Sequence, residues 1–259
     1  MAPSFDCAVS SLLCGEDNDG IFDDNDAGAV DDTWHNQTAG FRRGAHVGAE
    51  AEMVAVPLMG EETVAMMVGK EMQHQPNVDY LKRLRSGGLD FGARQEAVDW
   101  IGKVNAHFGF GPLCAYLSIN YLDRFLSAYE FPKGQAWTMQ LLSVACLSLA
   151  AKMEETDVPL SLDLQVVESK FVFEARTIQR MELLVLSTLQ WRMQAITPFS
   201  YIDHFLAKVN NDDTPTKSST LQSIQIILGT IKGIDFLEFR PSEVAAAVAI
   251  AVVGETKTV

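Results

Sequence analysis

Residues 137–152 form an unusually apolar stretch: Trp-Thr-Met-Gln-Leu-Leu-Ser-Val-Ala-Cys-Leu-Ser-Leu-Ala-Ala-Lys. From Leu141 to Ala151 the only side chains with a polar atom are two serines and one cysteine. A helix on a protein surface presents a polar face on every turn, and this stretch has none. It is also too short to cross a bilayer, which requires about 20 apolar residues. The stretch therefore predicts a helix buried inside a protein, with other helices packed around it.

The rest of the chain contains candidates for those surrounding helices. Apolar residues recur at helical spacing in segments separated by Gly and Pro, and strand patterns are essentially absent, so the predicted class is all-α. Asn77 is the predicted N-cap of an early helix, and Thr197, followed by Pro198, that of a later one. Besides the central stretch, helices are predicted near residues 61–72, 78–85, 94–107, 113–126, 161–167, 174–191, 197–206, 221–239 and 242–253.

The net charge of −14 is concentrated at the start of the chain. Residues 1–69 carry thirteen acids and two bases, a balance of −11, whereas the following 190 residues carry twenty-one acids and eighteen bases, a balance of −3. A nearly neutral folded part argues against a basic face for nucleic acid. Residues 1–60 are rich in Asp, Gly, Ala and Asn without periodicity, so we expect an acidic, largely disordered leader.

Several classes of site have no support in the sequence. The four cysteines include no CxxC pair and the five histidines have no metal-ligand spacing, so we expect no disulfide, metal or cofactor. The chain has no GxGxxG, P-loop or GxSxG motif, which makes an enzyme the least favoured class. The N-terminus lacks the features of a signal peptide, and the apolar run at 244–253 is too short to span a membrane.

A short motif lies inside the acidic leader. Leu12, Cys14 and Glu16 alternate along the chain and are followed by two aspartates. Alternate side chains of an extended peptide share a face, so these three would point together into a groove of a partner protein. The first two would fill small apolar pockets, and the carboxylate would accept hydrogen bonds from N–H groups at a helix N-terminus. The alternative is a chance occurrence, with a probability of roughly a few per cent.

Four ordered blocks of the chain resemble the cyclin box. Together with the LxCxE motif, these blocks make the chain similar to the D-type cyclins. Their amino-acid sequences are most like those of plant members. This resemblance implies a five-helix cyclin box whose third helix is the buried one. It divides the chain into the leader (1–60), a cyclin box with a preceding helix (61–194) and an incomplete second cyclin fold (195–259). The blocks are Arg94-Gln-Glu-Ala-Val-Asp-Trp100, Asn120-Tyr-Leu-Asp-Arg-Phe-Leu126, Leu149-Ala-Ala-Lys-Met-Glu-Glu155 and Gln179-Arg-Met-Glu-Leu-Leu-Val-Leu186.

The resemblance also assigns roles to single residues. Arg94 and Asp123 are implied to form an ion pair that locks the first two helices, and loss of one partner of such a buried pair costs on the order of 3–5 kcal/mol. Leu141 is implied to be a core position. Lys152 and Glu182 are similar to the pair that contacts the movable regulatory helix of a kinase. From the residues alone, Lys152 is instead interpreted as a solvated lysine at the negative end of a helix, and only the resemblance favours the kinase contact.

A second implied site is only partly present. Trp100 and Gln140 match a substrate-docking patch, but its Met and Leu are replaced by Ala93 and Ala97. Docking there is expected to be weaker or differently selective, and Trp100 is alternatively part of the core.

The implied function is regulatory and not catalytic. The chain would bind and activate a cyclin-dependent serine/threonine kinase and bring a retinoblastoma-related protein to it, promoting the G1/S transition in the nucleus, with a further population in the cytoplasm. Kinase inhibitors are further implied partners, whereas nucleic acid and membrane are not.

Two alternatives stay open. Truncation of the second fold could leave a competitor that binds kinase or pocket protein without activation. A cyclin-like transcription factor is disfavoured by the near-neutral charge of residues 70–259.

Overall fold

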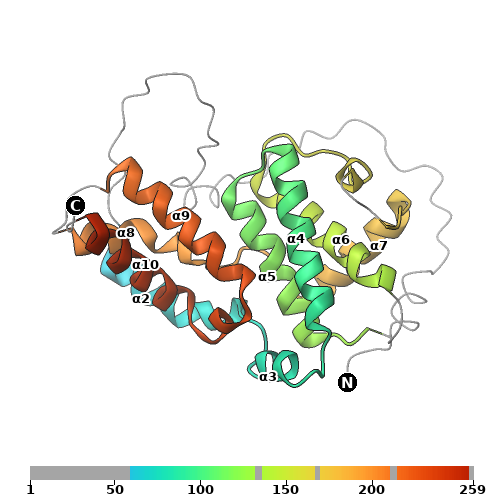
Figure 1. Ribbon diagram of the computed structural model, residues 1–259, viewed down its shortest axis with the longest axis horizontal. Coiled ribbons are helices and arrows are strands. Elements are labelled where there is room, and N and C mark those ends of the chain that lie inside the picture. The colour runs from blue at the N-terminus through green and yellow to red at the C-terminus, as the bar shows by residue number, and fades with distance from the viewer. Residues whose placement is uncertain (1–58, 132–135, 167–169, 211–214, 257–259) are drawn as a thin grey trace, which may run out of the picture. The chain divides into compact units, whose positions relative to one another are not determined.

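A computed structural model describes residues 59–131, 136–166, 170–210 and 215–256. All of them fall within one compact unit that runs from Pro57 to Val259. Every regular element in this described part is a helix, which confirms the predicted all-α class (Figure 1). The LxCxE residues Leu12, Cys14 and Glu16 lie outside the described residues.

The region that resembles the cyclin box is built on four α-helices and one short 3₁₀ turn. Asp90 caps the first helix, its carboxylate accepting from the Ala93 N–H at 2.9 Å, so this helix begins three residues before the predicted start. Gly109 ends it in the left-handed region at φ 66°, a conformation that costs glycine little. The elements are α4 (Phe91–Phe108), α5 (Pro112–Ala128), α6 (Ala136–Glu154), η3 (Asp163–Gln165) and α7 (Ala175–Thr188).

The helix predicted near residues 161–167 is wrong in the part that the structure describes. Only Asp163–Gln165 are helical, and they form a single 3₁₀ turn. Leu164 is the one residue of this turn that enters the core. The Gln165 side chain holds the main chain of Phe173 through two hydrogen bonds, at 2.7 and 3.0 Å. A longer helix would need further apolar side chains to bury, and this turn buries only Leu164. The chain therefore makes one turn and continues to α7.

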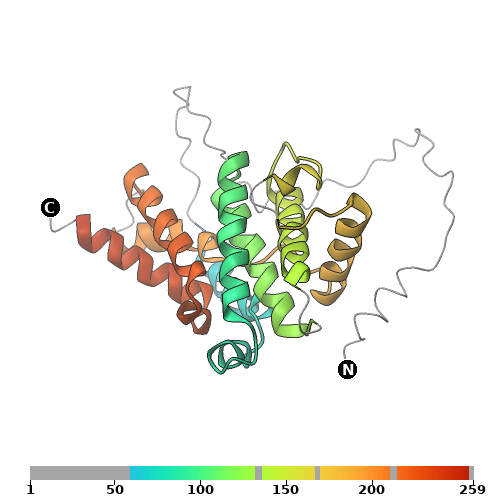
Figure 2. The same cartoon turned by 45° about the vertical axis from the view of Figure 1, so that its right-hand side comes forward.

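The central helix α6 is buried as predicted. Every residue from Leu141 to Ala151 is buried, and α4, α5 and α7 all pack against this helix. The three alanines at 145, 150 and 151 have no exposed surface, which lets the neighbouring helices approach closely. Figure 2 shows α4 and α7 standing on opposite sides of α6.

The segment before the cyclin box folds as α2 (Glu61–Lys70), η2 (Glu71–His74) and α3 (Tyr80–Arg85). The prediction that Asn77 caps α3 is wrong, because its side-chain amide donates instead to the Ser127 carbonyl at 3.0 Å. The amide therefore ties this segment to the end of α5. Gly87, at φ 76°, follows the end of α3.

The second fold contains η4 (Pro198–Ser200), α8 (Ile202–Val209), α9 (Lys217–Lys232), η5 (Ile234–Glu238) and α10 (Pro241–Thr256). Thr197 caps η4, and not a full helix, with its N–H donating to the Ser200 hydroxyl at 3.2 Å. The single helix predicted over 221–239 is wrong in its length. It starts earlier, where the Thr216 hydroxyl accepts from the Ser219 N–H, and it breaks at Gly233, whose extended backbone separates α9 from η5.

Candidate functional site

Lys152 and Glu182 lie together where α6 packs against α7, with the lysine reaching the surface and the glutamate nearly buried. Lys152 is in the last turn of α6 and Glu182 is in the middle of α7, and these two helices pack against each other. The ammonium donates to both carboxylate oxygens, at 2.8 and 2.7 Å. The Lys152 side chain is 48% exposed, whereas that of Glu182 is 8% exposed. The structure thus brings the two predicted residues into one ion pair with an accessible cation.

This arrangement differs from a lysine that only caps a helix end. A nearly buried carboxylate fixes the position of the ammonium, because both oxygens hold it in a forked contact. The half-exposed ammonium can still donate to an oxygen of a partner. The pair can therefore present a positioned charge at a protein interface, which a freely rotating surface lysine does not do.

Apolar residues neighbour this pair on α6 and α7, and an exposed tryptophan that the sequence did not predict follows the end of α7. Met153 and Leu186, on the same two helices, are half-buried, and Leu183 is exposed. Trp191, just past the end of α7, is 66% exposed and has a left-handed backbone at φ 59°. Exposed tryptophans are frequent anchors of protein interfaces. The sequence signal for it was a lone Trp among Gln and Arg directly after the last inward-facing leucine.

The predicted ion pair between Arg94 and Asp123 is present and lies in the core. Nε and one Nη of the guanidinium donate to the two carboxylate oxygens at 2.7 and 2.8 Å, and neither side chain is appreciably exposed. Tyr80 also donates to this carboxylate, at 2.7 Å. Burial works against the charged guanidinium, but the carboxylate beside it outweighs burial, so the pKa of Arg94 lies above its ordinary value.

Arg94 also reaches the second fold, which the sequence did not predict. Its remaining N–H groups donate to the carbonyls of Ile231 and Lys232, at 3.3 and 3.2 Å. These carbonyls lie at the end of α9, where a helix has unsatisfied acceptors and a negative dipole end. One side chain thus joins α4, α5 and α9. Leu141, the remaining predicted structural residue, is buried in α6.

The residues of the predicted docking patch lie on two helices that pack together. Trp100, on α4, and Gln140, on α6, are both half-buried. The Gln140 amide is engaged inside the chain, because it donates to the Phe171 carbonyl at 2.9 Å and accepts from its N–H at 3.3 Å. A docked peptide would have to compete with this contact for the amide.

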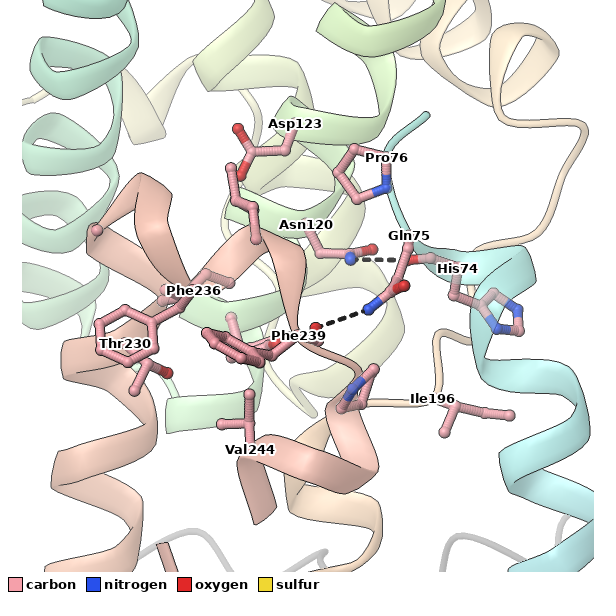
Figure 3. A pocket seen from close by; sticks show the side chains of 15 residues that line it. His74, Gln75, Pro76, Asn120, Asp123, Ile196, Thr230, Phe236, Phe239 and Val244 are labelled. Carbon is pink, nitrogen blue, oxygen red and sulfur yellow. Dashed lines mark hydrogen bonds between the residues drawn. The ribbon is translucent and has the colours of Figure 1, made fainter. Parts of the chain in front are cut away.

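A pocket lies where α5 meets the segment before the cyclin box and the second fold (Figure 3). Asn120 donates to the His74 carbonyl at 3.0 Å, and Gln75 donates to the Phe239 carbonyl at 2.9 Å. Phe236 and Val244 line the pocket from the other side. Burial, with Arg124 and Arg192 adding to it, lowers the pKa of His74 to about 4, so this imidazole is neutral at pH 7.

The described residues hold no cluster of three side chains suited to bind a metal ion. Cys114 and Cys146 are buried free thiols, and burial raises the pKa of both above the ordinary value. Within the part of the chain that the structure covers, none of the helices combines the length and the hydropathy needed to cross a membrane.

Comparison with known proteins matches two family models to the chain: the cyclin N-terminal domain over residues 62–194 and the cyclin C-terminal domain over residues 196–258. Cyclin-D4-1 of Oryza sativa subsp. japonica is 61% identical over 205 residues, covering 78% of this chain and 57% of that protein. Cyclin-D4-2 of Arabidopsis thaliana is 58% identical over 200 residues, covering 77% of this chain and 67% of that protein. Cyclin-D4-2 of Oryza sativa subsp. japonica is 50% identical over 276 residues, covering 98% of this chain and 71% of that protein.

The chain thus spans between 57% and 71% of the length of these three relatives. All three are D-type cyclins of plants, as the four sequence blocks had implied. With both cyclin domain models matched over a helical fold of the expected class, the chain belongs to the cyclin family and is similar to plant D-type cyclins.

Proposed function

We propose that this chain is a regulatory subunit that binds and activates a cyclin-dependent serine/threonine kinase. The observation that carries the proposal is the Lys152–Glu182 ion pair, held at 2.7 Å with its ammonium half exposed. Met153, next to Lys152 on α6, and Leu186, one turn beyond Glu182 on α7, are half-buried, so a partner helix meets apolar side chains as well as a fixed charge. Family membership supplies the class of partner.

In this proposal the pair acts by selecting one conformation of the kinase. The ammonium of Lys152 donates to carbonyls or a carboxylate of the kinase's regulatory helix, while Glu182 accepts from N–H groups of the same helix. These contacts exist only when the helix is in its active position, where the kinase's own Lys–Glu pair forms. Binding then shifts the kinase population toward that state. The chain itself carries out no chemical step.

The test is phosphate transfer by a purified plant cyclin-dependent kinase with and without the chain. We expect Lys152→Ala/Glu182→Ala to lower activation by at least tenfold at a fixed concentration. The chain offers a matched control in Lys170 and Glu96, a second Lys–Glu pair at 3.3 Å that is mostly exposed on both sides. Lys170→Ala/Glu96→Ala should activate normally. Equal activation by both double variants would remove the role assigned to Lys152 and Glu182.

The same assay separates activation from simple occupancy. A chain that binds the kinase with micromolar or better affinity but produces no phosphate transfer is a competitor and not an activator. Binding measured by calorimetry, together with turnover, distinguishes the two functions.

We also propose that the LxCxE segment recruits a retinoblastoma-related pocket protein to the kinase. The support is the sequence itself: Leu12, Cys14 and Glu16 share a face in an extended peptide, and acidic residues follow them. A peptide of residues 8–22 should bind the pocket protein, and replacement of all three by alanine should abolish binding. Unchanged binding of the triple variant would reject the motif.

The cellular part of the proposal is a role at the G1/S transition in the nucleus. Its support is the similarity to D-type cyclins. Induced expression of the fluorescently tagged chain in G1-arrested plant cells should give nuclear signal and earlier DNA synthesis. Exclusively cytoplasmic signal without a change in S-phase entry would contradict it.

A further inference from the structure

Arg124, on α5, is a buried cation that has no counter-charge in the described part of the chain. It is 5% exposed and takes part in none of the ion pairs between described residues. Among these residues only its Nη1 finds acceptors, the Arg192 carbonyl at 2.9 Å and the Asn120 side-chain oxygen at 3.4 Å. The adjacent Asp123 does not neutralise it, because Arg94 holds both oxygens of that carboxylate. A buried charge without a partner is costly, so this position favours the binding of an anion.

Two further basic side chains act on this guanidinium or feel its charge. Arg192, which follows the end of α7, is exposed. Burial, with a contribution from the charge of Arg192, lowers the pKa of Arg124 to about 10, so the guanidinium stays charged at pH 7. His74, at the end of η2, lies close enough for both arginines to help burial lower its pKa. The described charges that act on this histidine are therefore both positive.

The His74 imidazole has an unused hydrogen-bonding atom. Its Nδ1 is buried and has no hydrogen-bond partner among the described residues. The main-chain carbonyl of the same residue is fixed, because it accepts from Asn120 at 3.0 Å. In Figure 3 the ring points away from Phe236 and Phe239, the phenylalanines of the pocket. An imidazole nitrogen that carries a proton can donate to an anion. We call the side chains of His74, Arg124 and Arg192 the basic cluster.

We infer that the basic cluster is an anion site that takes a phosphate group, either free or on a phosphorylated side chain. A phosphate monoester carries about −1.5 to −2 charges at pH 7, which matches two guanidinium groups, whereas a carboxylate supplies only one charge. The planar guanidinium fork also fits phosphate oxygens. The exposed Arg192 meets the ligand first, and the buried Arg124 gains the counter-charge that it lacks.

This site uses none of the residues assigned to the kinase contact. The inference therefore does not rest on the proposed function, and each can fail without the other. Its closing experiment needs only the full chain and small phosphate compounds.

The test measures binding of inorganic phosphate to the full chain by calorimetry, with sodium chloride of equal ionic strength as reference. Arg192→Ala should weaken binding by about tenfold or more, because a charge-assisted hydrogen bond is lost. Arg176→Ala is the matched control, because Arg176 is also exposed and without an ion pair among the described residues, but lies on α7. Arg124→Gln should abolish binding. It also removes the bond to the Arg192 carbonyl, so Arg192→Ala is the decisive variant.

A second readout reports contact at the histidine itself. Phosphate bound beside His74 should raise the pKa of its imidazole from about 4 toward the ordinary 6.5, because a nearby anion favours the protonated ring. The titration is followed by NMR, with His74→Gln to assign the signal.

A parallel titration identifies the source of the phosphate group. N-acetyl-phosphoserine amide replaces inorganic phosphate, with the unphosphorylated amide as blank. Binding about tenfold tighter than that of inorganic phosphate would support a phosphorylated protein as the ligand, and equal or weaker binding would support free phosphate.

The inference is supported if Arg192→Ala weakens phosphate binding, Arg176→Ala does not, and the pKa of His74 rises. It is overturned if phosphate has no effect beyond that of sodium chloride, or if both arginine variants lose affinity equally. Acetate that binds as tightly as phosphate would also overturn it, because the charge match would then select nothing. Phosphate binding that leaves the pKa of His74 unchanged would place the ligand elsewhere and overturn it as well.

Discussion

Two helices of this molecule look alike in sequence but have different surroundings. Both α6 and α10 are apolar on all sides. In α6 every residue from Leu141 to Ala151 is buried. In α10 only one side is buried, through residues such as Val248 and Val252, while Ala247, Ile250 and Ala251 are exposed.

The difference comes from the helices around them. Helices α4, α5 and α7 surround α6, whereas α10 packs against α8, α9 and η4, with the segment before the cyclin box beside it (Figure 1). An apolar sequence on all sides of a helix therefore predicts that the helix is buried. It does not predict how completely the neighbouring helices enclose it. The following variants test this contrast, beginning with the one that affects both folds.

The largest effect is expected from Arg94→Ala. It leaves the Asp123 carboxylate buried without its cation and also removes the hydrogen bonds to the end of α9. We expect a loss of about 3–5 kcal/mol in the free energy of unfolding, measured by urea denaturation. Since Arg94 joins both folds, and the described tryptophans (Trp100, Trp137 and Trp191) all lie in the first fold, the unfolding transitions seen by tryptophan fluorescence and by circular dichroism should no longer coincide. A single unchanged transition would show that the two folds are coupled by other contacts.

A matched pair of valines compares the two helices directly. Val144 in α6 is fully buried and Val248 in α10 nearly so. Val144→Ala should cost about 2–3 kcal/mol of unfolding free energy, because the lost methyl groups leave a cavity that three helices cannot close. Val248→Ala should cost about 1–2 kcal/mol, since the partly exposed helix can shift toward its neighbours. Equal costs in urea denaturation would mean that α10 is as tightly enclosed as α6.

Glu71, in the segment before the cyclin box, is expected to stabilise the start of α10. This fully buried carboxylate accepts from the Ser242 N–H at 3.0 Å, from its hydroxyl at 2.8 Å and from the Tyr201 hydroxyl at 3.1 Å. A carboxylate at the first turn of a helix satisfies N–H groups and opposes the positive dipole end. Glu71→Ala should lower stability by about 2 kcal/mol, because three donors lose their acceptor.

Hydrogen exchange locates the effect of Glu71→Ala. Amides of α10 should exchange faster, while those of α6 keep their protection. Glu71→Gln, which retains size and one acceptor oxygen, is the control and should have a smaller effect. Uniformly faster exchange in both helices would show that Glu71 supports the whole unit and not α10 alone.

How far the sequence predicts this structure depends on the range of the interaction. The burial of α6 and the Arg94–Asp123 pair follow from local composition and family spacing, so both could be predicted. The contacts of Glu71 with Ser242 and of Asn77 with Ser127 join residues far apart in the chain. No local pattern marks them, which is why the sequence predicts a helix cap at Asn77 and the structure does not have one. The sequence predicts a helix near residues 161–167, where the structure has only the 3₁₀ turn η3. Only Leu164 of this turn is buried, so a longer helical face has nothing to pack against.

The candidate site divides in the same way. Lys152 and Glu182 were assigned through family resemblance, but their direct contact depends on the packing of α6 on α7. The helical pattern predicts a helix that continues to Trp191, but α7 ends at Thr188. The exposure of Trp191 results from the left-handed backbone that follows, which no helical pattern encodes.

A pH effect of moderate size is expected at His74, next to the contacts that join α5 to the second fold. Burial, helped by Arg124 and Arg192, lowers its pKa from 6.5 to about 4. The unfolded chain then takes up the proton first, so stability is lost as the pH falls from about 6.5 toward 4. His74→Gln should show a smaller loss of unfolding free energy between pH 7 and 4.5 than wild type. Identical losses would mean that His74 is equally protonated in the folded and unfolded chain.

The smallest effect on stability is expected at the exposed face of α10. Ile250 is 62% exposed, so Ile250→Ser should change the free energy of unfolding by no more than about 0.5 kcal/mol. The same variant should reduce any concentration-dependent association seen by sedimentation velocity, because it interrupts an exposed apolar surface. A loss above about 1 kcal/mol would require Ile250 to be buried in solution. The outer face of α10 would then be enclosed as that of α6 is, and the contrast between the two helices would not hold.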